Sequence, residues 1–173
     1  LFVSFEESAP ELTANLKSVN LAFGPQEESG RLVLHSGRAI EKGLEDHLIT
    51  IADRVAQEAP QLLVLDPVSA LMDMGTTSQV KMLMIRFITL VKGMGTTLVL
   101  TELLPDGSED VSDLAISSLV DTWIRLRQVE SNGELNRLIN VIKARGSRTS
   151  NQVKEFTITD HGIGVEDAYI GEG

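Results

Sequence analysis

The sequence contains no cysteine among its 173 residues. This absence excludes thiol catalysis, disulfide bonds and any zinc or iron–sulfur site with cysteine ligands, and it is compatible with a reducing cytoplasm. Histidine is also scarce, and His35, His47 and His161 are isolated, without metal-ligand spacing. We therefore predict that these histidines are surface or turn residues.

Long apolar runs are missing as well. No apolar segment reaches the roughly 18 to 20 residues of a membrane span, and no signal peptide is visible, so we expect no membrane partner and a cytoplasmic location. Basic residues number 15 against 25 acidic ones, which gives a net charge of −10. This charge argues against broad binding to a phosphate backbone, so we do not expect nucleic acid as a partner.

The phosphate-binding loop G-x-x-x-x-G-K-S/T does not occur in the sequence. The first residue, Leu1, is not an initiator methionine, and an apolar strand is predicted to begin there. We therefore expect a piece of a longer protein whose phosphate-binding loop lies upstream. The length fits one domain over residues 1–173, with a core that needs no disulfides.

The segment LLVLDPVSAL, residues 62–71, places four apolar residues directly before Asp66 and Pro67. Such a run predicts a central parallel strand, covered by helices on both faces. In open sheets of this type ligands bind beyond the carboxyl ends of the strands, where Asp66 lies. The alternative is that Asp66 only caps a turn before Pro67.

Strands and helices alternate through most of the chain. Further strands are predicted at residues 1–5, 31–35 and 96–103. Helices are predicted after the capping box of Ser8 and Glu11, over residues 43–59, and from residues 76–78 to Lys92, with a polar loop at 24–30. Apolar residues nearly surround the last helix, which predicts burial on two sides, in this core or against another subunit.

The pattern changes to hairpins near the C-terminus. Residues 121–130 and 134–145 predict two antiparallel strands joined by residues 131–133, and residues 154–159 predict another strand. The glycine-rich end after Gly162 is predicted to be a frayed tail. The predicted fold class is therefore α/β, a mostly parallel sheet flanked by helices, with a C-terminal antiparallel extension.

Charged residues follow several predicted strands. Glu6, Glu7 and Asp66 could supply the base and the metal ligands of phosphoryl transfer, with Asp66 and Glu6 on the metal. Strand alternation predicts that Arg137, Lys143 and Arg145 share one face, where Lys143 and Arg145 could grip a phosphate beside Ser147 and Thr149. The alternative is a solvated edge strand whose charges deter pairing.

Four segments together resemble a known family: FVSFEESAPEL, LLVLDPVSAL, ISSLVDTWIRLRQVESNGELNRLINVIKARGS and EFTITDHGIGVEDA. They are similar to the KaiC-type domain of the RecA-like ATPases, the family of the cyanobacterial clock ATPase. The similarity covers residues 2 to about 168. It implies a RecA-like sheet, ATP and Mg²⁺ as cofactors, and a hexameric ring with nucleotide between subunits.

The resemblance also implies roles for individual residues. Glu6 and Glu7 match the family's paired catalytic glutamates, and Asp66 matches the acid that holds Mg²⁺ through water. Ser18 matches a residue near the adenine pocket, and Arg137 an arginine at the base or the subunit interface. Seven positions match residues that line the neighbouring subunit's nucleotide, the first and third reaching the γ-phosphate: Lys143, Ala144, Arg145, Ser147, Thr149, Thr159 and Asp160.

In the clock protein's kinase half, phosphorylated hydroxyls lie where this chain has Ser117 and Ser118, with Ser112 earlier. The alternative is a turn-forming serine pair. The leading hypothesis is that the longer protein is a ring-forming ATPase, and also an autokinase if these serines are modified. The 173-residue piece, which lacks the phosphate-binding loop, is expected to bind ATP weakly or not at all and to be inactive. The alternative is a non-catalytic RecA-like module that binds a signalling protein; a DNA recombinase relative is disfavoured by the acidity.

Overall fold

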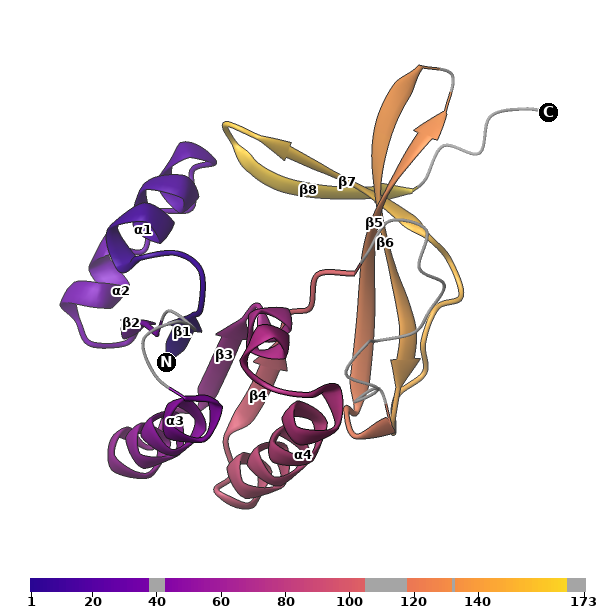
Figure 1. The fold of residues 1–173 in the computed structure, drawn as a ribbon. Coiled ribbons are helices and arrows are strands. Elements are labelled where there is room, and N and C mark those ends of the chain that lie inside the picture. The colour runs from indigo at the N-terminus through magenta and orange to yellow at the C-terminus, as the bar shows by residue number, and fades with distance from the viewer. Residues whose placement is uncertain (38–42, 105–117, 132, 168–173) are drawn as a thin grey trace. The chain divides into compact units, whose positions relative to one another are not determined.

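The computed structural model describes residues 1–37, 43–104, 118–131 and 133–167 (Figure 1). The chain divides into two compact units, one of residues 1–14 and 22–119 and the other of residues 15–21 and 120–173. Each unit is built around its own four-stranded sheet. The expectation of one domain over residues 1–173 stays a prediction.

The first unit contains a parallel sheet in the order β2-β1-β3-β4. Its strands are β1 (Phe2–Ser4), β2 (Leu34–Ser36), β3 (Leu62–Asp66) and β4 (Thr97–Leu100). Ser4, the last residue of β1, pairs with Ser36 on one side and Asp66 on the other. The prediction that residues 62–66 form an internal parallel strand is confirmed.

The first unit contains the beginning of α1 (Ala9–Ser18), up to residue 14, and the whole of α2 (Gly24–Glu28), α3 (Leu44–Glu58), the 3₁₀ helix η2 (Val68–Met74) and α4 (Thr77–Gly93). The predicted capping box before α1 is confirmed, because the Ser8 amide donates to the Glu11 carboxylate at 2.8 Å and the Glu11 amide to the Ser8 hydroxyl at 3.5 Å. The predicted loop at residues 24–30 is wrong over α2. Pro25 stands in the first turn of that helix, where its missing amide proton is not needed.

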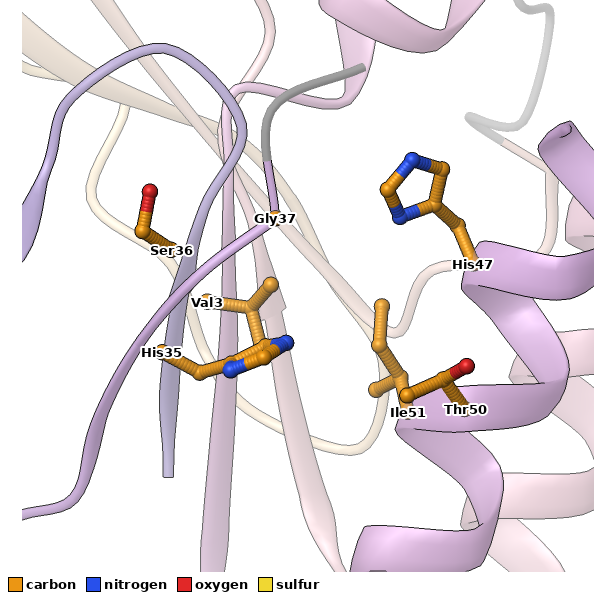
Figure 2. A pocket seen from close by; sticks show the side chains of 7 residues that line it. All are labelled: Val3, His35, Ser36, Gly37, His47, Thr50 and Ile51. Atoms are coloured by element: carbon orange, nitrogen blue, oxygen red, sulfur yellow. The ribbon is translucent and has the colours of Figure 1, made fainter. Parts of the chain in front are cut away.

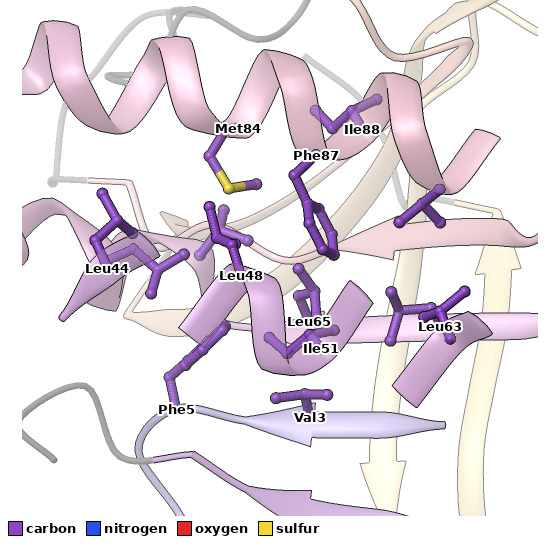
Figure 3. Close-up of a cluster of buried hydrophobic side chains, with 14 of the residues drawn as sticks. Val3, Phe5, Leu44, Leu48, Ile51, Leu63, Leu65, Met84, Phe87 and Ile88 are labelled. Atoms are coloured by element: carbon purple, nitrogen blue, oxygen red, sulfur yellow. The ribbon is translucent and has the colours of Figure 1, made fainter. Parts of the chain in front are cut away.

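The core of the first unit lies between one face of the sheet and the helices α3 and α4 (Figure 3). Leu63 and Leu65 of β3 are fully buried there, and Leu98 and Leu100 of β4 pack against the same cluster. The opposite face is more open, with Leu62 45% and Val99 42% exposed. Within the part of the chain that the structure describes, only one face of this sheet is buried, so the predicted burial on both faces is not observed there.

Helix α4 buries one face and leaves the other in solvent. Val80, Met84, Phe87, Ile88 and Val91 are buried, whereas Met82 and Leu90 are exposed. Burial on two sides within this core is therefore wrong, and burial against another subunit stays a prediction. No helix among the described residues is long and apolar enough to cross a membrane.

The second unit contains an antiparallel sheet in the order β5-β6-β7-β8. Its strands are β5 (Thr122–Ser131), β6 (Glu134–Ala144), β7 (Lys154–Thr159) and β8 (Gly162–Asp167). The predicted hairpin of β5 and β6 and the strand β7 are confirmed. The predicted tail after Gly162 is wrong over β8. This strand pairs with β7 along its whole length, and its apolar residues Ile163 and Val165 occupy alternate positions. The α/β class with an antiparallel extension is confirmed.

Candidate functional site at the carboxyl edge of the parallel sheet

Three predicted acids stand at or just after the carboxyl ends of two neighbouring strands of the parallel sheet. Asp66 ends β3 directly opposite Ser4 of β1, and the amide of Phe5 donates to the Asp66 carbonyl at 2.9 Å. Glu6 and Glu7 follow Phe5 at once, so they leave the sheet at the edge where Asp66 lies. Parallel strands all end at this edge, where ligands bind in such sheets.

Thr101 holds the carboxylate of Asp66. The Thr101 hydroxyl donates to Oδ1 of Asp66. The backbone of Thr101 is fixed on both sides, because its amide donates to the Leu65 carbonyl at 3.1 Å and its carbonyl accepts from the Val68 amide at 2.8 Å. No role was predicted for Thr101 from the sequence. The sequence signal for Thr101 is a hydroxyl residue directly after an apolar strand, when the preceding strand in the sequence ends in an acid.

Two serines hold the backbone of Glu7. Its amide donates to the Ser4 hydroxyl at 2.9 Å, and its carbonyl accepts from the Ser36 hydroxyl at 3.2 Å. Ser4 is only 3% exposed, whereas the side chain of Glu6 reaches solvent and that of Glu7 is half-buried. Both serines occupy the last positions of their strands, β1 and β2, and neither was predicted as a site residue.

The acids of this edge fit the chemistry of Mg²⁺. This ion prefers oxygen ligands, keeps several waters, and in nucleotide sites binds one or two carboxylates together with phosphate oxygens. No group of three or more metal-ligating side chains occurs within the described ranges. Asp66 and Glu6, as one or two carboxylates completed by water and phosphate, match this mode of binding.

A small cavity of about 50 Å³ lies between β1, β2 and α3 (Figure 2). It is far smaller than the roughly 300 to 1,000 Å³ of a cofactor pocket, so it does not hold a nucleotide. His47 lines it and is only 4% exposed, so the predicted surface position of His47 is wrong. The helical period places His47 with Leu44, Leu48 and Ile51 on the buried face of α3. His35 is half-buried, and His161 lies in the exposed turn between β7 and β8.

In the second unit, the cations predicted to share one face of β6 do not. Val141 pairs with Ile124, but Lys143 pairs with Trp123, so an extra residue interrupts the ladder. Residues that pair across two strands point to the same side of the sheet, whereas neighbours along one strand point to opposite sides. Trp123 and Ile124 are neighbours, so their partners Lys143 and Val141 lie on opposite faces. Arg137 shares the face of Val141, so the bulge places Lys143 on the other face. A rule of strict alternation cannot anticipate a bulge.

Lys143 and Arg145 nevertheless lie together at the end of β6. The Lys143 ammonium donates to the Val120 carbonyl at 2.9 Å. The Arg145 amide donates to the Asp121 carbonyl at 2.8 Å, and its guanidinium lies 3.6 Å from the Asp121 carboxylate. We call Lys143 and Arg145 the cationic tip.

The remaining predicted nucleotide residues occupy other places. Ala144 ends β6, and Ser147 and Thr149 follow in an exposed loop, next to the cationic tip in sequence. Thr159 and Asp160 lie at the turn between β7 and β8. Since β7 runs antiparallel to β6 from the pairing of Lys154 with Ile139, this turn lies at the other end of the sheet from the tip. Arg137 is half-buried in β6, and Ser18 is exposed at the end of α1, its hydroxyl donating to the Asn15 carbonyl at 2.7 Å.

Of the predicted phosphorylation sites, Ser118 is exposed. Ser112 and Ser117 lie outside the described residues.

Comparisons with known proteins agree on one family. The model of the family "ATPase: KaiC" matches residues 1–169. The chain is 35% identical to the "Circadian clock protein KaiC2" of Synechocystis sp. over 176 aligned residues, which cover all of this chain and 31% of that protein. It is 30% identical to the "Circadian clock oscillator protein KaiC" of Picosynechococcus sp. and of Prochlorococcus marinus, covering 98% of this chain and 33% and 34% of those proteins.

The chain thus spans about a third of the length of the curated relatives that it matches. The match with the family model extends from the acids at the edge of the parallel sheet to the last strand of the antiparallel sheet. This chain belongs to the KaiC family of ATPases.

Proposed function

We propose that the longer protein hydrolyses Mg·ATP in the cytoplasm, in a hexameric ring whose subunit interfaces hold the nucleotide. The observation that supports this most is that Asp66 ends one strand of the parallel sheet, and that Glu6 and Glu7 follow the carboxyl end of the neighbouring strand. Phosphoryl transfer requires an oriented nucleophile, a metal held by carboxylate, and positive charge near the transferred group. These acids provide the first two requirements.

Each acid has its own role in this proposal. Glu6 and Glu7 form the base that accepts a proton from the attacking water. Asp66 holds Mg²⁺ through water, and Glu6 adds a second carboxylate to the ion. When bound, Mg²⁺ neutralises charge on the phosphate oxygens.

The cations come from the next copy of the chain. Lys143 and Arg145 of the cationic tip stabilise the charge of the γ-phosphate, Lys143 as a point charge and Arg145 as a planar fork. Ser18 and the proposed nucleotide-lining residues outside the distant turn between β7 and β8 then complete the site: Arg137, Ala144, Ser147 and Thr149. Because one copy holds only part of the site, hydrolysis depends on assembly of the ring.

The test is the double substitution Glu6→Gln and Glu7→Gln in the full-length protein. Glutamine keeps the size of the side chain but cannot accept the proton, so we expect hydrolysis to fall by at least about 100-fold. Size-exclusion chromatography should show unchanged assembly. Glu28→Gln, which changes an exposed acid of α2, is the control. Unchanged hydrolysis in the double variant, with the control active, contradicts the base assignment.

A finer proposal concerns autophosphorylation. The longer protein phosphorylates itself on Ser117 and Ser118, which mass spectrometry after incubation with ATP would detect.

The alternative function is a non-catalytic module that uses this fold to bind a signalling protein. The acids at the sheet edge favour the enzyme, because a binding module has no need for them there.

A further inference from the structure

We propose that Ser36 and Ser4 are positioning residues, which hold the peptide of Glu7 and thereby aim the pair of Glu6 and Glu7 at the reacting water. This inference rests on the proposed function, since it assigns the pair the role of base. Neither serine touches the nucleotide in this proposal.

The two hydrogen bonds act on opposite ends of one residue. The Ser4 hydroxyl accepts from the Glu7 amide at 2.9 Å, and the Ser36 hydroxyl donates to the Glu7 carbonyl at 3.2 Å. The backbone dihedrals of Glu7 lie between these two groups. Fixing both ends therefore restricts the rotations that would swing its side chain and that of Glu6.

The serines themselves are held by the sheet. Ser4 and Ser36 are paired residues of neighbouring parallel strands, and the Gly37 amide donates to the Ser4 carbonyl at 2.9 Å. On its other side Ser4 pairs with Asp66. Glu6 and Glu7 lie on a loop, but Ser4 connects that loop to β3, the strand that carries the proposed metal ligand Asp66.

Packing alone does not explain the hydroxyl of Ser36. The residue is half-buried and is not a member of the apolar core. Ser36 is one of the residues that line the small cavity, and Figure 2 shows its hydroxyl pointing away from His35, its neighbour in β2. Its bond to Glu7 spans 29 residues of sequence, so it is not a local turn contact. The Ser36 hydroxyl therefore stabilises the loop that follows β1, in which Glu7 lies.

The test compares Ser36→Ala, Ser36→Thr and a matched control in the full-length protein. Ser29→Ala is that control, because the exposed Ser29 also donates to a main-chain carbonyl at 3.2 Å, that of Gln26, at the end of α2. We expect Ser36→Ala to lower kcat by about 10- to 100-fold through displaced acids. The KM for ATP should stay within about twofold, since no nucleotide contact is lost. Ser36→Thr keeps the hydroxyl and should retain most of kcat.

A second measurement does not depend on turnover. Amide hydrogen exchange, followed by mass spectrometry or NMR, reports opening of the Glu7 amide. We expect its exchange to accelerate about tenfold in Ser36→Ala and to keep its wild-type rate in Ser29→Ala. This readout applies even where the variant is too unstable for kinetics.

The outcomes separate the two proposals. A wild-type protein without ATPase activity contradicts the proposed function. An active wild type in which Ser36→Ala matches Ser29→Ala in both kcat and Glu7 exchange overturns the positioning role and leaves the function standing. Loss of kcat in Ser36→Ala with retention in Ser36→Thr and faster Glu7 exchange supports the positioning role.

Discussion

The hydroxyl of Thr101 donates a hydrogen bond to the carboxylate of Asp66, and so links the residue after β4 to the last residue of β3. The two strands are parallel neighbours, and Leu65 pairs with Leu100 directly before these residues. The bond occupies one oxygen of Asp66 and fixes the plane of its carboxylate. Partners of this kind orient a metal ligand without touching the metal.

From this bond we expect Thr101→Val to weaken Mg²⁺ binding. The substitution keeps the shape of the side chain but removes the donor, so the Mg²⁺ concentration for half-maximal ATPase activity should rise about 10- to 100-fold. Thr101→Ser keeps the donor and should behave as wild type. Thr97→Val, at the exposed start of the same strand, is the control. Equal Mg²⁺ dependence in the two valine variants would show that the bond does not serve the metal.

Mixing of inactive subunits tests whether each site uses two copies. One variant carries Glu6→Gln with Glu7→Gln, and the other carries Lys143→Ala with Arg145→Ala. Neither should hydrolyse ATP alone. In mixed rings, acids from the second variant can meet a cationic tip from the first, so random exchange should restore about a quarter of the interfaces.

The matched controls are two samples that contain one variant each and go through the same subunit-exchange procedure. Activity that stays absent after verified subunit exchange would place acids and cations of one site in a single copy. Activity near a quarter of wild type would support the shared site.

Leu65 and Leu62 lie on opposite faces of β3 and should respond differently to truncation. Leu65 is fully buried against α3 and α4, so Leu65→Ala removes apolar contacts and leaves a cavity, at about 2–5 kcal/mol of unfolding free energy. Leu62 is nearly half exposed, so Leu62→Ala should change that free energy by less than about 1 kcal/mol. Urea denaturation followed by circular dichroism measures both. Similar losses in the two variants would contradict the assignment of the core to one face of the sheet.

When the 173-residue chain is prepared by itself, the amino group of Leu1 should give that preparation a pH-dependent stability. It donates to the Leu62 carbonyl at 2.9 Å, and partial burial lowers its pKa below the ordinary value of 8.0, an effect that nearby Glu58 opposes. Between the lowered pKa and 8.0 the unfolded chain binds more protons than the folded chain. The free energy of unfolding should therefore rise with pH through this window and level off above it.

Acetylation of the amino group removes this titration and leaves an amide that can still donate to Leu62. Denaturation of both chains at several pH values between about 6 and 10, about two units on either side of the ordinary pKa of 8.0, provides the comparison. An equal slope in the acetylated chain would assign the dependence to other groups.

Much of the fold could be predicted from local patterns. The capping box of Ser8 and Glu11 and the helical period of α3 depend on residues a few positions apart, as does the apolar run of β3. The element α2 was missed because five residues with a proline resemble a loop. The strand β8 was missed because glycines outweighed the alternation of Ile163 and Val165.

The candidate site was predictable in part. Acids at the ends of apolar strands in a parallel sheet must share one edge, which is why the sequence alone suffices to group Glu6 and Glu7 with Asp66. The bulge before Lys143 could not be foreseen, because it arises from the register of two strands.

The sequence by itself determined most of the segments that form strands and helices, and which acids stand at the strand ends, because period, capping and chain direction are local properties. Only the tertiary structure decided that Thr101 reaches Asp66, that Ser36 reaches Glu7, and that Lys143 turns away from Arg137. Each of these contacts depends on the order and register of strands far apart in the chain. No local pattern of residues encodes that order.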